Sequence, residues 1–228
     1  VNSHGLPHPD HVTTARDLAT LAVAMIRDHP EQYAIYKERE FTYNDIRQYN
    51  RNTLLAEDPT VDGMKTGHTE EAGYCLVASA VRRDMRLVTV VMGTSSTRAR
   101  ANETRSLLNY GFRFFETSEV FTAMNELEQP RIWKGQEDYV PVGVMEATVL
   151  TLPRGKQKLL ETEFDLDEPL EAPLAVGDEV GSVTLKLDGE TVFRGPVVAL
   201  QAVEPGGFFA RLWDMLLMWI ASLFRAAG

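Results

Sequence analysis

Cysteine is almost absent from this 228-residue sequence. The single cysteine, Cys75, cannot form an internal disulfide, and no Cys/His spacing resembles a zinc site. Cys75 lies in an apolar run, so we expect a small buried side chain rather than a nucleophile. The sequence therefore predicts neither a disulfide scaffold nor a metal site.

An excess of basic residues is also missing. The chain has 23 Lys and Arg against 33 Asp and Glu, which gives a formal net charge of −10, and it contains no basic stripe. A surface that binds phosphates needs clustered cations. We therefore do not expect nucleic acid as a partner.

The start of the sequence has neither an initiator methionine nor a signal peptide. Residues 1–7 are typical of a loop inside a longer protein, so we expect the true N-terminus to lie upstream. At 228 residues, 44% of them apolar, the chain can bury the core of one large or two small domains.

Residues 1–116 mix helical and strand patterns. Thr14 to Asp17 resembles a capping box, and Pro30 follows the expected helix. An apolar stripe with helical spacing lies between them: Leu18, Leu21, Ala22, Met25 and Ile26. A second helix is expected from Thr97 to Tyr110, ending at Gly111. Leu107 and Leu108 are expected to face inward from this second helix.

Two runs rich in β-branched residues predict a hairpin. They are residues 73–81 and 85–92, with a short turn at residues 82–84. Each run is nearly all apolar, so both faces of the hairpin should be buried, as in a sheet covered by helices.

Residues 117–204 contain short strand candidates separated by turns. The candidates are residues 147–152, 158–164, 179–187 and 191–202. Asp188-Gly189 between the last two is a strong hairpin signal. The pattern predicts a small β-sandwich. No catalytic cluster stands out, so we expect a spacer or interaction domain.

Residues 205–228 begin with Pro205-Gly206-Gly207, which has the composition of a hinge, and continue as an amphipathic segment. Its polar residues fall on one narrow arc of a helix: Arg211, Asp214, Ser222 and Arg225. The apolar residues expected to contact a membrane are Phe208, Phe209, Leu212, Trp213, Leu216, Trp219, Ile220 and Phe224.

Three interpretations of this segment compete. The uncharged run from Met215 to Phe224 has only 10 residues, about 15 Å of helix, which is half a bilayer core. A packed terminal helix would need more protein around it than the end of a chain offers. A helix lying in the membrane interface, with Trp213 and Trp219 as anchors, fits best.

Lys65-Thr66-Gly67 is the one short pattern with a catalytic mechanism attached to it. In serine acyltransferases that act on penicillin or on acyl-D-Ala-D-Ala, it lies on the strand that borders the active site. The Lys supplies positive charge, the Thr hydroxyl can bind the substrate's carboxylate, and the Gly leaves room for the substrate. By itself the tripeptide also fits a simple turn before a strand.

The order of these features resembles the class C low-molecular-mass penicillin-binding proteins, the D-alanyl-D-alanine carboxypeptidases of the penicillin-binding protein 5 and 6 type. Matching stretches occur along the whole chain. They are residues 3–6, 14–17, 35–38, 46–48, 50–52, 61–63, 63–69, 72–74 and 110–116.

The resemblance implies an α/β (α+β) fold, with residues 1–116 forming the C-terminal part of a serine DD-peptidase domain of the β-lactamase and transpeptidase type. A β-sandwich domain over residues 117–204 and a membrane-anchoring amphipathic helix over residues 205–228 would follow. The implied location is peripheral, on the periplasmic face of the bacterial inner membrane.

The resemblance also implies roles for particular residues. Lys65, Thr66 and Gly67 would form the family's third active-site motif. The N–H of His68 would be one oxyanion donor, and its imidazole would shape the rim.

The residues that hold the substrate carboxylate would include three more. Thr69 and Arg100 would help to bind it, and Arg51 would lie near the same pocket.

The family's Ser-x-x-Lys and Ser-x-Asn motifs do not occur in this sequence. Both lie upstream in the family, so the nucleophilic serine is expected in an N-terminal part of the same protein. We expect this chain alone to be inactive.

The resemblance implies an enzyme that removes the terminal D-Ala from peptidoglycan stem peptides through an acyl-enzyme. It would bind β-lactams and need no cofactor. Two alternatives remain: an enzyme like a class A β-lactamase, and a membrane-tethered cell-wall binding protein without a nucleophile. The β domain and the amphipathic tail argue against the first alternative.

Overall fold

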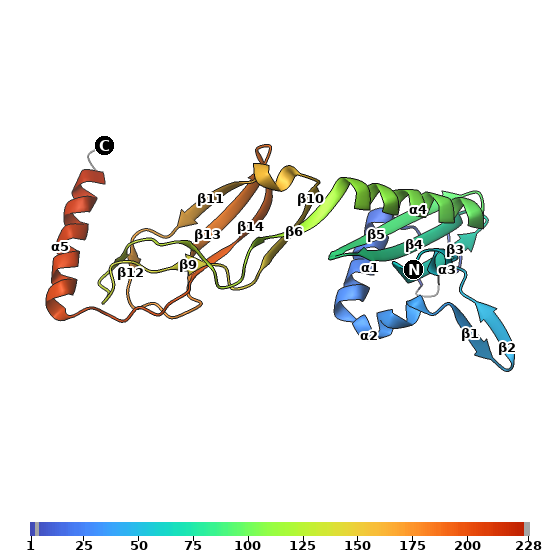
Figure 1. Ribbon diagram of the computed structural model, residues 1–228, viewed down its shortest axis with the longest axis horizontal. Helices are drawn as coiled ribbons and strands as arrows, with labels where there is room; N and C mark the ends of the chain where they lie inside the picture. The colour runs from blue at the N-terminus through green and yellow to red at the C-terminus, as the bar shows by residue number, and fades with distance from the viewer. Residues whose placement is uncertain (3–4, 226–228) are drawn as a thin grey trace. The chain divides into compact units, whose positions relative to one another are not determined.

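The computed structural model describes residues 1–2 and 5–225, with side chains up to residue 220 (Figure 1). The chain divides after Glu116 into two compact units.

The first unit is built on a three-stranded antiparallel sheet in the order β3-β4-β5 (Figure 1). The strands are β3 (Val61–Thr69), β4 (Gly73–Arg82) and β5 (Met85–Thr94). The β4–β5 hairpin is confirmed, with a turn in which Arg83 adopts a positive φ. The order of the strands leaves β3 at one edge of this sheet.

Helix α4 (Thr97–Phe114) covers one face of the sheet (Figure 1). The core on this side consists of Leu54, Leu55, Val61, Leu76, Ala78, Ala80, Ala101 and Leu108. The other face meets α1 (Ala15–Asp28) and Tyr33 of α2 (Pro30–Tyr33). Val77, Val88 and Val90 on that face are half-buried. The expected burial of both faces is therefore closer to complete on the α4 side than on the α1 side.

Helix α1 begins as the sequence predicts. The N–H of Asp17 donates to the Thr14 hydroxyl over 3.1 Å, and the Asp17 carboxylate accepts from the N–H of Thr14 over 3.1 Å. This pair is a capping box, which satisfies two backbone donors at the helix start. The helix ends at Asp28, and Pro30 begins the next helix.

The expected end of α4 at Gly111 is wrong, because the helix continues to Phe114. Gly111 lies where α4 approaches β5, and a Cβ there would overlap the side chain of Leu87. Leu108 is buried as expected, whereas Leu107 is 46% exposed.

A small hairpin that the sequence analysis missed connects α2 to the sheet. It follows η1 (Ala34–Lys37) and consists of β1 (Glu40–Tyr43) and β2 (Ile46–Tyr49). Its two turn residues, Asn44 and Asp45, both have positive φ, which is the signature of a tight hairpin turn. The short helix α3 (Leu54–Glu57) then leads to β3.

The second unit contains a five-stranded sheet in the order β11-β13-β14-β9-β7 and two small two-stranded sheets, β10-β6 and β12-β8. The first sheet comprises β11 (Glu161–Leu166), β13 (Glu179–Leu187), β14 (Glu190–Ala199), β9 (Val142–Gly143) and β7 (Glu126–Glu128). The other strands are β6 (Phe115–Phe121), β10 (Thr148–Pro153), β8 (Ile132–Trp133) and β12 (Leu170–Glu171). One apolar core joins them. The expected β domain is therefore present.

The hairpin predicted at Asp188-Gly189 is confirmed, with positive φ at both residues. The strand expected from residue 158 is partly wrong, since residues 156–159 form a 3₁₀ turn, η2 (Lys156–Leu159), before β11.

Helix α5 (Phe208–Arg225) ends the described chain (Figure 1). Within the described residues, no helix combines the length and the hydropathy needed to span a membrane.

Candidate active-site edge

The Lys-Thr-Gly motif lies in the middle of β3. This strand pairs with β4 on one side, where Lys65 faces Val77 and Gly67 faces Cys75. In the order of the described sheet, the other side of β3 is an edge. An extended peptide can add to a sheet edge through main-chain hydrogen bonds, so this side of β3 is a candidate binding edge.

Lys65 is exposed on this edge. Its ammonium donates to the carbonyl oxygen of the neighbouring Thr66 over 2.6 Å. From the sequence, Lys65 was expected on the strand that borders an active site whose serine comes from an upstream segment. In the described chain it faces outward from one wall.

Gly67 is exposed, and nothing within the described chain requires a glycine there. Its φ is not in the left-handed region, and a Cβ would come no closer than 3.9 Å to another side chain, that of Cys75. Cys75 itself is half-buried, so its expected burial is only partial. The tolerance at Gly67 contrasts with Gly63, where a Cβ would overlap the Tyr33 hydroxyl. A requirement for glycine at position 67 would therefore come from something that lies against the edge.

His68 is held in place by an aromatic neighbour. Its imidazole stacks on the ring of Tyr74, the residue opposite it on β4, with ring centroids 3.9 Å apart. The guanidinium of Arg100 lies 5.8 Å from the centroid of the same Tyr74 ring. Thr69 ends the strand, and its hydroxyl accepts from the N–H of Ala72 over 2.9 Å.

Arg100, on the first turns of α4, is buried rather than solvated, with 5% of its surface exposed. It donates to the carbonyl oxygen of Gly67 over 3.4 Å and to that of Arg51 over 3.1 Å. Burial lowers the pKa of Arg100 below its ordinary value, and the nearby Arg51 cation lowers it further, while Cys75 and Tyr74 act in the opposite direction. A guanidinium still keeps its charge under these conditions. Arg100 thus braces the backbone of the motif.

Arg51 is exposed and stands between two asparagines whose role the sequence analysis did not identify. Asn52 is 2% exposed and donates to the carbonyl of Gly63 over 3.0 Å. Asn50 accepts from the N–H of Asn52 over 2.9 Å and donates to the carbonyl of Glu38 over 2.9 Å. The Asn-Arg-Asn order in the sequence was the available signal. These bonds fix the backbone that presents Arg51.

A polar network supports the start of β3. The hydroxyl of Tyr33 donates to Asp62 over 2.9 Å, and Arg86 forms an ion pair with Asp62 at 2.8 Å. Arg86 also donates to the buried Ser79 hydroxyl over 2.6 Å. Burial, together with the nearby Asp62 charge, raises the pKa of Tyr33 to about 12, although a hydrogen bond with Ser79 opposes the shift. The network therefore holds Tyr33 as a neutral donor.

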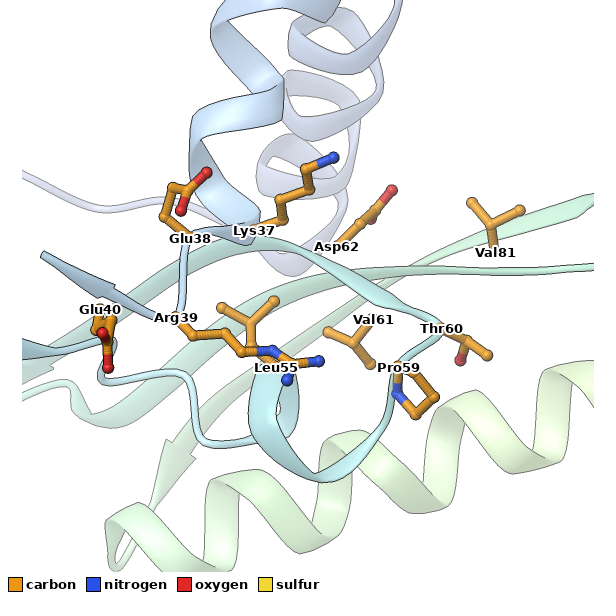
Figure 2. Close-up of a pocket in the computed structure, with 10 residues that line it drawn as sticks. All are labelled: Lys37, Glu38, Arg39, Glu40, Leu55, Pro59, Thr60, Val61, Asp62 and Val81. Carbon is orange, nitrogen blue, oxygen red and sulfur yellow. The ribbon is translucent and has the colours of Figure 1, made fainter.

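A groove of about 690 Å³ lies elsewhere in this unit (Figure 2). It is lined by Lys37, Glu38, Arg39, Glu40, Leu55, Pro59, Thr60, Val61, Asp62 and Val81. Its lining reaches the first residues of β3 and does not include Lys65. The groove is therefore separate from the Lys-Thr-Gly edge.

The apolar residues predicted to contact a membrane lie exposed on α5. Their exposed fractions range from 38% at Ile220 to 82% at Phe209. The others are Phe208, Leu212, Trp213, Leu216 and Trp219. The side chain of Phe224 lies outside the described residues.

Residues 1–96 match the family model of D-alanyl-D-alanine carboxypeptidases, and residues 115–205 match that of the penicillin-binding protein 5 C-terminal domain. The chain belongs to the D-alanyl-D-alanine carboxypeptidase family of penicillin-binding proteins.

Among its relatives is the D-alanyl-D-alanine carboxypeptidase DacC of Escherichia coli, 47% identical over 227 residues, which are 97% of this chain and 57% of DacC. DacA of Escherichia coli is 44% identical over 93% of this chain and 53% of its own length. The crystal structure of penicillin-binding protein 5 from Haemophilus influenzae is 42% identical with a TM-score of 0.77, covering 88% of this chain and 59% of that one. The chain thus spans about half the length of the curated relatives it matches.

Proposed function

We propose that this chain is the C-terminal part of a serine-type D-Ala-D-Ala carboxypeptidase that trims peptidoglycan stem peptides. The observation that carries the proposal is the exposed Lys65-Thr66-Gly67 edge of β3, braced from behind by Arg100. Relatives that bear the carboxypeptidase name match 97% and 93% of the chain.

The roles on this edge follow from its chemistry. A substrate that ends in a free carboxylate is bound by a cation and hydroxyl donors, which Lys65 and Thr66 provide. The backbone N–H of His68 serves as an oxyanion donor. Thr69 and Arg51 contribute to the carboxylate side of the pocket, and Arg100 contributes through the backbone that it holds.

The reaction needs a nucleophile that this chain does not contain. In the intact enzyme a serine attacks the carbonyl of the penultimate D-Ala, expels the terminal D-Ala and forms an acyl-enzyme, which water then hydrolyses. β-Lactams acylate the same serine. The exposure of Lys65 is consistent with this proposal. This chain would line one side of the active site, and the serine-bearing segment would line the opposite side.

We further propose that α5 lies on the periplasmic face of the inner membrane. Its exposed phenylalanines, leucines and tryptophans match a helix that inserts its apolar side into the headgroup region. Because α5 carries only two cations in its sequence, Arg211 and Arg225, apolar insertion contributes more than attraction to anionic lipid.

Fluorescent penicillin tests the enzyme proposal. The intact protein that includes this chain should become covalently labelled and should release D-Ala from a peptide ending in D-Ala-D-Ala, whereas the 228-residue chain alone should do neither. Rapid β-lactam hydrolysis without D-Ala release would favour a β-lactamase. Absence of both activities in the intact protein would favour a cell-wall binding protein.

A further inference from the structure

Helix α5 is attached to the β domain through one residue of its polar arc, Asp214. The Asp214 side chain is only 18% exposed, whereas Phe208, Phe209 and Trp213 on the same helix are each at least 62% exposed. An amphipathic helix on a protein surface ordinarily buries its apolar stripe against the protein. Here Asp214 is half-buried together with Leu217 and Met218, whereas Arg211 on the polar arc and most apolar residues of the helix are exposed.

The attachment is a specific set of bonds around Asp214. One carboxylate oxygen accepts from the backbone N–H of Lys134, just after β8, over 2.6 Å. The other lies 3.8 Å from the Arg131 guanidinium, which in turn sits 4.0 Å from the centroid of the Trp133 ring. A carboxylate that accepts a backbone hydrogen bond makes a charge-assisted contact, stronger than a neutral one.

The connection that leads into α5 is also bound to the β domain. The N–H of Gly206 donates to the carbonyl of Lys134 over 2.7 Å, and the N–H of Gln136 donates to the carbonyl of Glu204 over 2.9 Å. Gly135 and Pro205 form a β-bridge. At Gly206 a Cβ would press against the carbonyl of Gly135. The glycine therefore permits a close approach of two backbones, and Gly206 is bonded to the β domain within the Pro205-Gly206-Gly207 segment that was expected to act as a hinge.

We propose that Asp214 is a positioning residue that fixes the rotation of α5 about its own axis, so that the β domain stands on a lipid surface in one orientation. The proposal rests on the lipid contact proposed above. If α5 turned by half a revolution, Asp214 would lose both partners and the exposed tryptophans would face the β domain. Helix α5 therefore keeps one fixed orientation relative to the β domain when it lies on the lipid surface.

Amide hydrogen exchange tests the hydrogen bond between the Lys134 N–H and the Asp214 carboxylate in the absence of lipid. In the wild-type protein the Lys134 N–H should be protected, and Asp214→Leu should accelerate its exchange about tenfold or more, because a hydrogen bond to a charged group is lost. Asp214→Asn, which keeps an acceptor but removes the charge, should give a smaller acceleration. Arg211→Leu, an exposed change on the same polar arc, is the matched control and should leave the rate unchanged. A Lys134 amide that exchanges freely in the wild type would overturn this hydrogen bond and the positioning role of Asp214.

Time-resolved energy transfer on phosphatidylcholine vesicles tests the consequence. Glu190→Cys in a Cys75→Ser background provides a single thiol in the β domain for the donor, and the acceptor is carried by the lipid headgroups. With Asp214 intact, this labelled protein and its Arg211→Leu variant should show one narrow distance distribution. Asp214→Leu should bind the vesicles as well but with a broadened distribution.

The outcomes separate the two proposals. A protein with Asp214 intact that does not bind vesicles, or that self-associates through α5, overturns the lipid contact. It also overturns the fixed orientation of the β domain on the lipid surface. Vesicle binding with equally narrow distributions with Asp214 intact and in Asp214→Leu leaves the lipid contact standing and overturns the role of Asp214. Circular dichroism of each variant checks that the fold is retained.

Discussion

Lys65 carries the enzyme proposal at the scale of single residues. In the intact protein, Lys65→Ala should reduce penicillin acylation about a hundredfold or more, as expected for loss of a charged group aimed at the reacting centre. The fold should persist, because the exposed ammonium bonds only to the carbonyl of Thr66 among the described contacts. Labelling with fluorescent penicillin measures the effect, with Lys37→Ala as the control. Normal acylation of Lys65→Ala would contradict the site.

Tyr74 is the residue that orients His68. Tyr74→Leu removes the ring that stacks on the imidazole at 3.9 Å and should lower kcat/KM of the intact enzyme about tenfold, because loss of positioning is costly in an active site. Tyr74→Phe retains the stack and should behave like the wild type. The His68 ring protons provide a second readout by NMR, since they should lose their ring-current shift only in the leucine variant. Equal activity of the two variants would rule out this role.

Tyr33 should show its environment as an unusually late titration. Its pKa of about 12 lies above the ordinary value of 10. A raised pKa in the folded state means that the contribution to stability is fully present below about pH 10 and is lost as the pH rises toward 12. The difference in absorbance between the wild type and Tyr33→Phe, followed at alkaline pH, measures the pKa of the Tyr33 phenol. A Tyr33 phenol that ionises near pH 10 in the folded protein would refute the buried network.

Helix α5 carries the membrane proposal at the scale of elements. Deletion of residues 208–228 from the intact protein should release it from membranes and leave D-Ala release unchanged, because all the residues that we assign to the β3 edge lie between Arg51 and Arg100. Fractionation and a D-Ala assay measure the two effects. Persistent membrane association after the deletion would refute the anchor.

Strand β3 is supported by elements on either side of its motif. Arg100 of α4 reaches the carbonyl of Gly67, while Asn52, which precedes α3, binds the carbonyl of Gly63. The backbone is therefore held by buried polar side chains two residues before the motif, at Gly63, and at its last residue, Gly67. Rigid support of this kind is what a preorganised binding edge requires.

At the scale of the whole molecule, the two units divide the work that we propose. Residues 1–116 hold the substrate edge, and the second unit carries the lipid-facing helix on a bonded support. The chain covers 57% of DacC and 53% of DacA from Escherichia coli, and our proposal assigns the nucleophilic serine to a segment outside these 228 residues.

The sequence by itself determined the features that depend on neighbouring residues. The capping box at Thr14, the Asp188-Gly189 turn, the β4–β5 hairpin and the amphipathic character of α5 are local patterns, and the structure confirms each of them. The family likewise followed from short motifs in a set order. The roles of the individual residues on the β3 edge stay predictions.

Only the tertiary structure decided the features that depend on partners far along the chain. Arg100 turns inward to a carbonyl 49 residues away, and Asp214 is bound 80 residues from its own position. Gly111 and Gly206 look like a helix end and a hinge, but each marks a close approach to a distant segment. The physical reason is that periodicity and turn chemistry report local preference, whereas burial of a charge or a glycine contact depends on which distant surface packs against it.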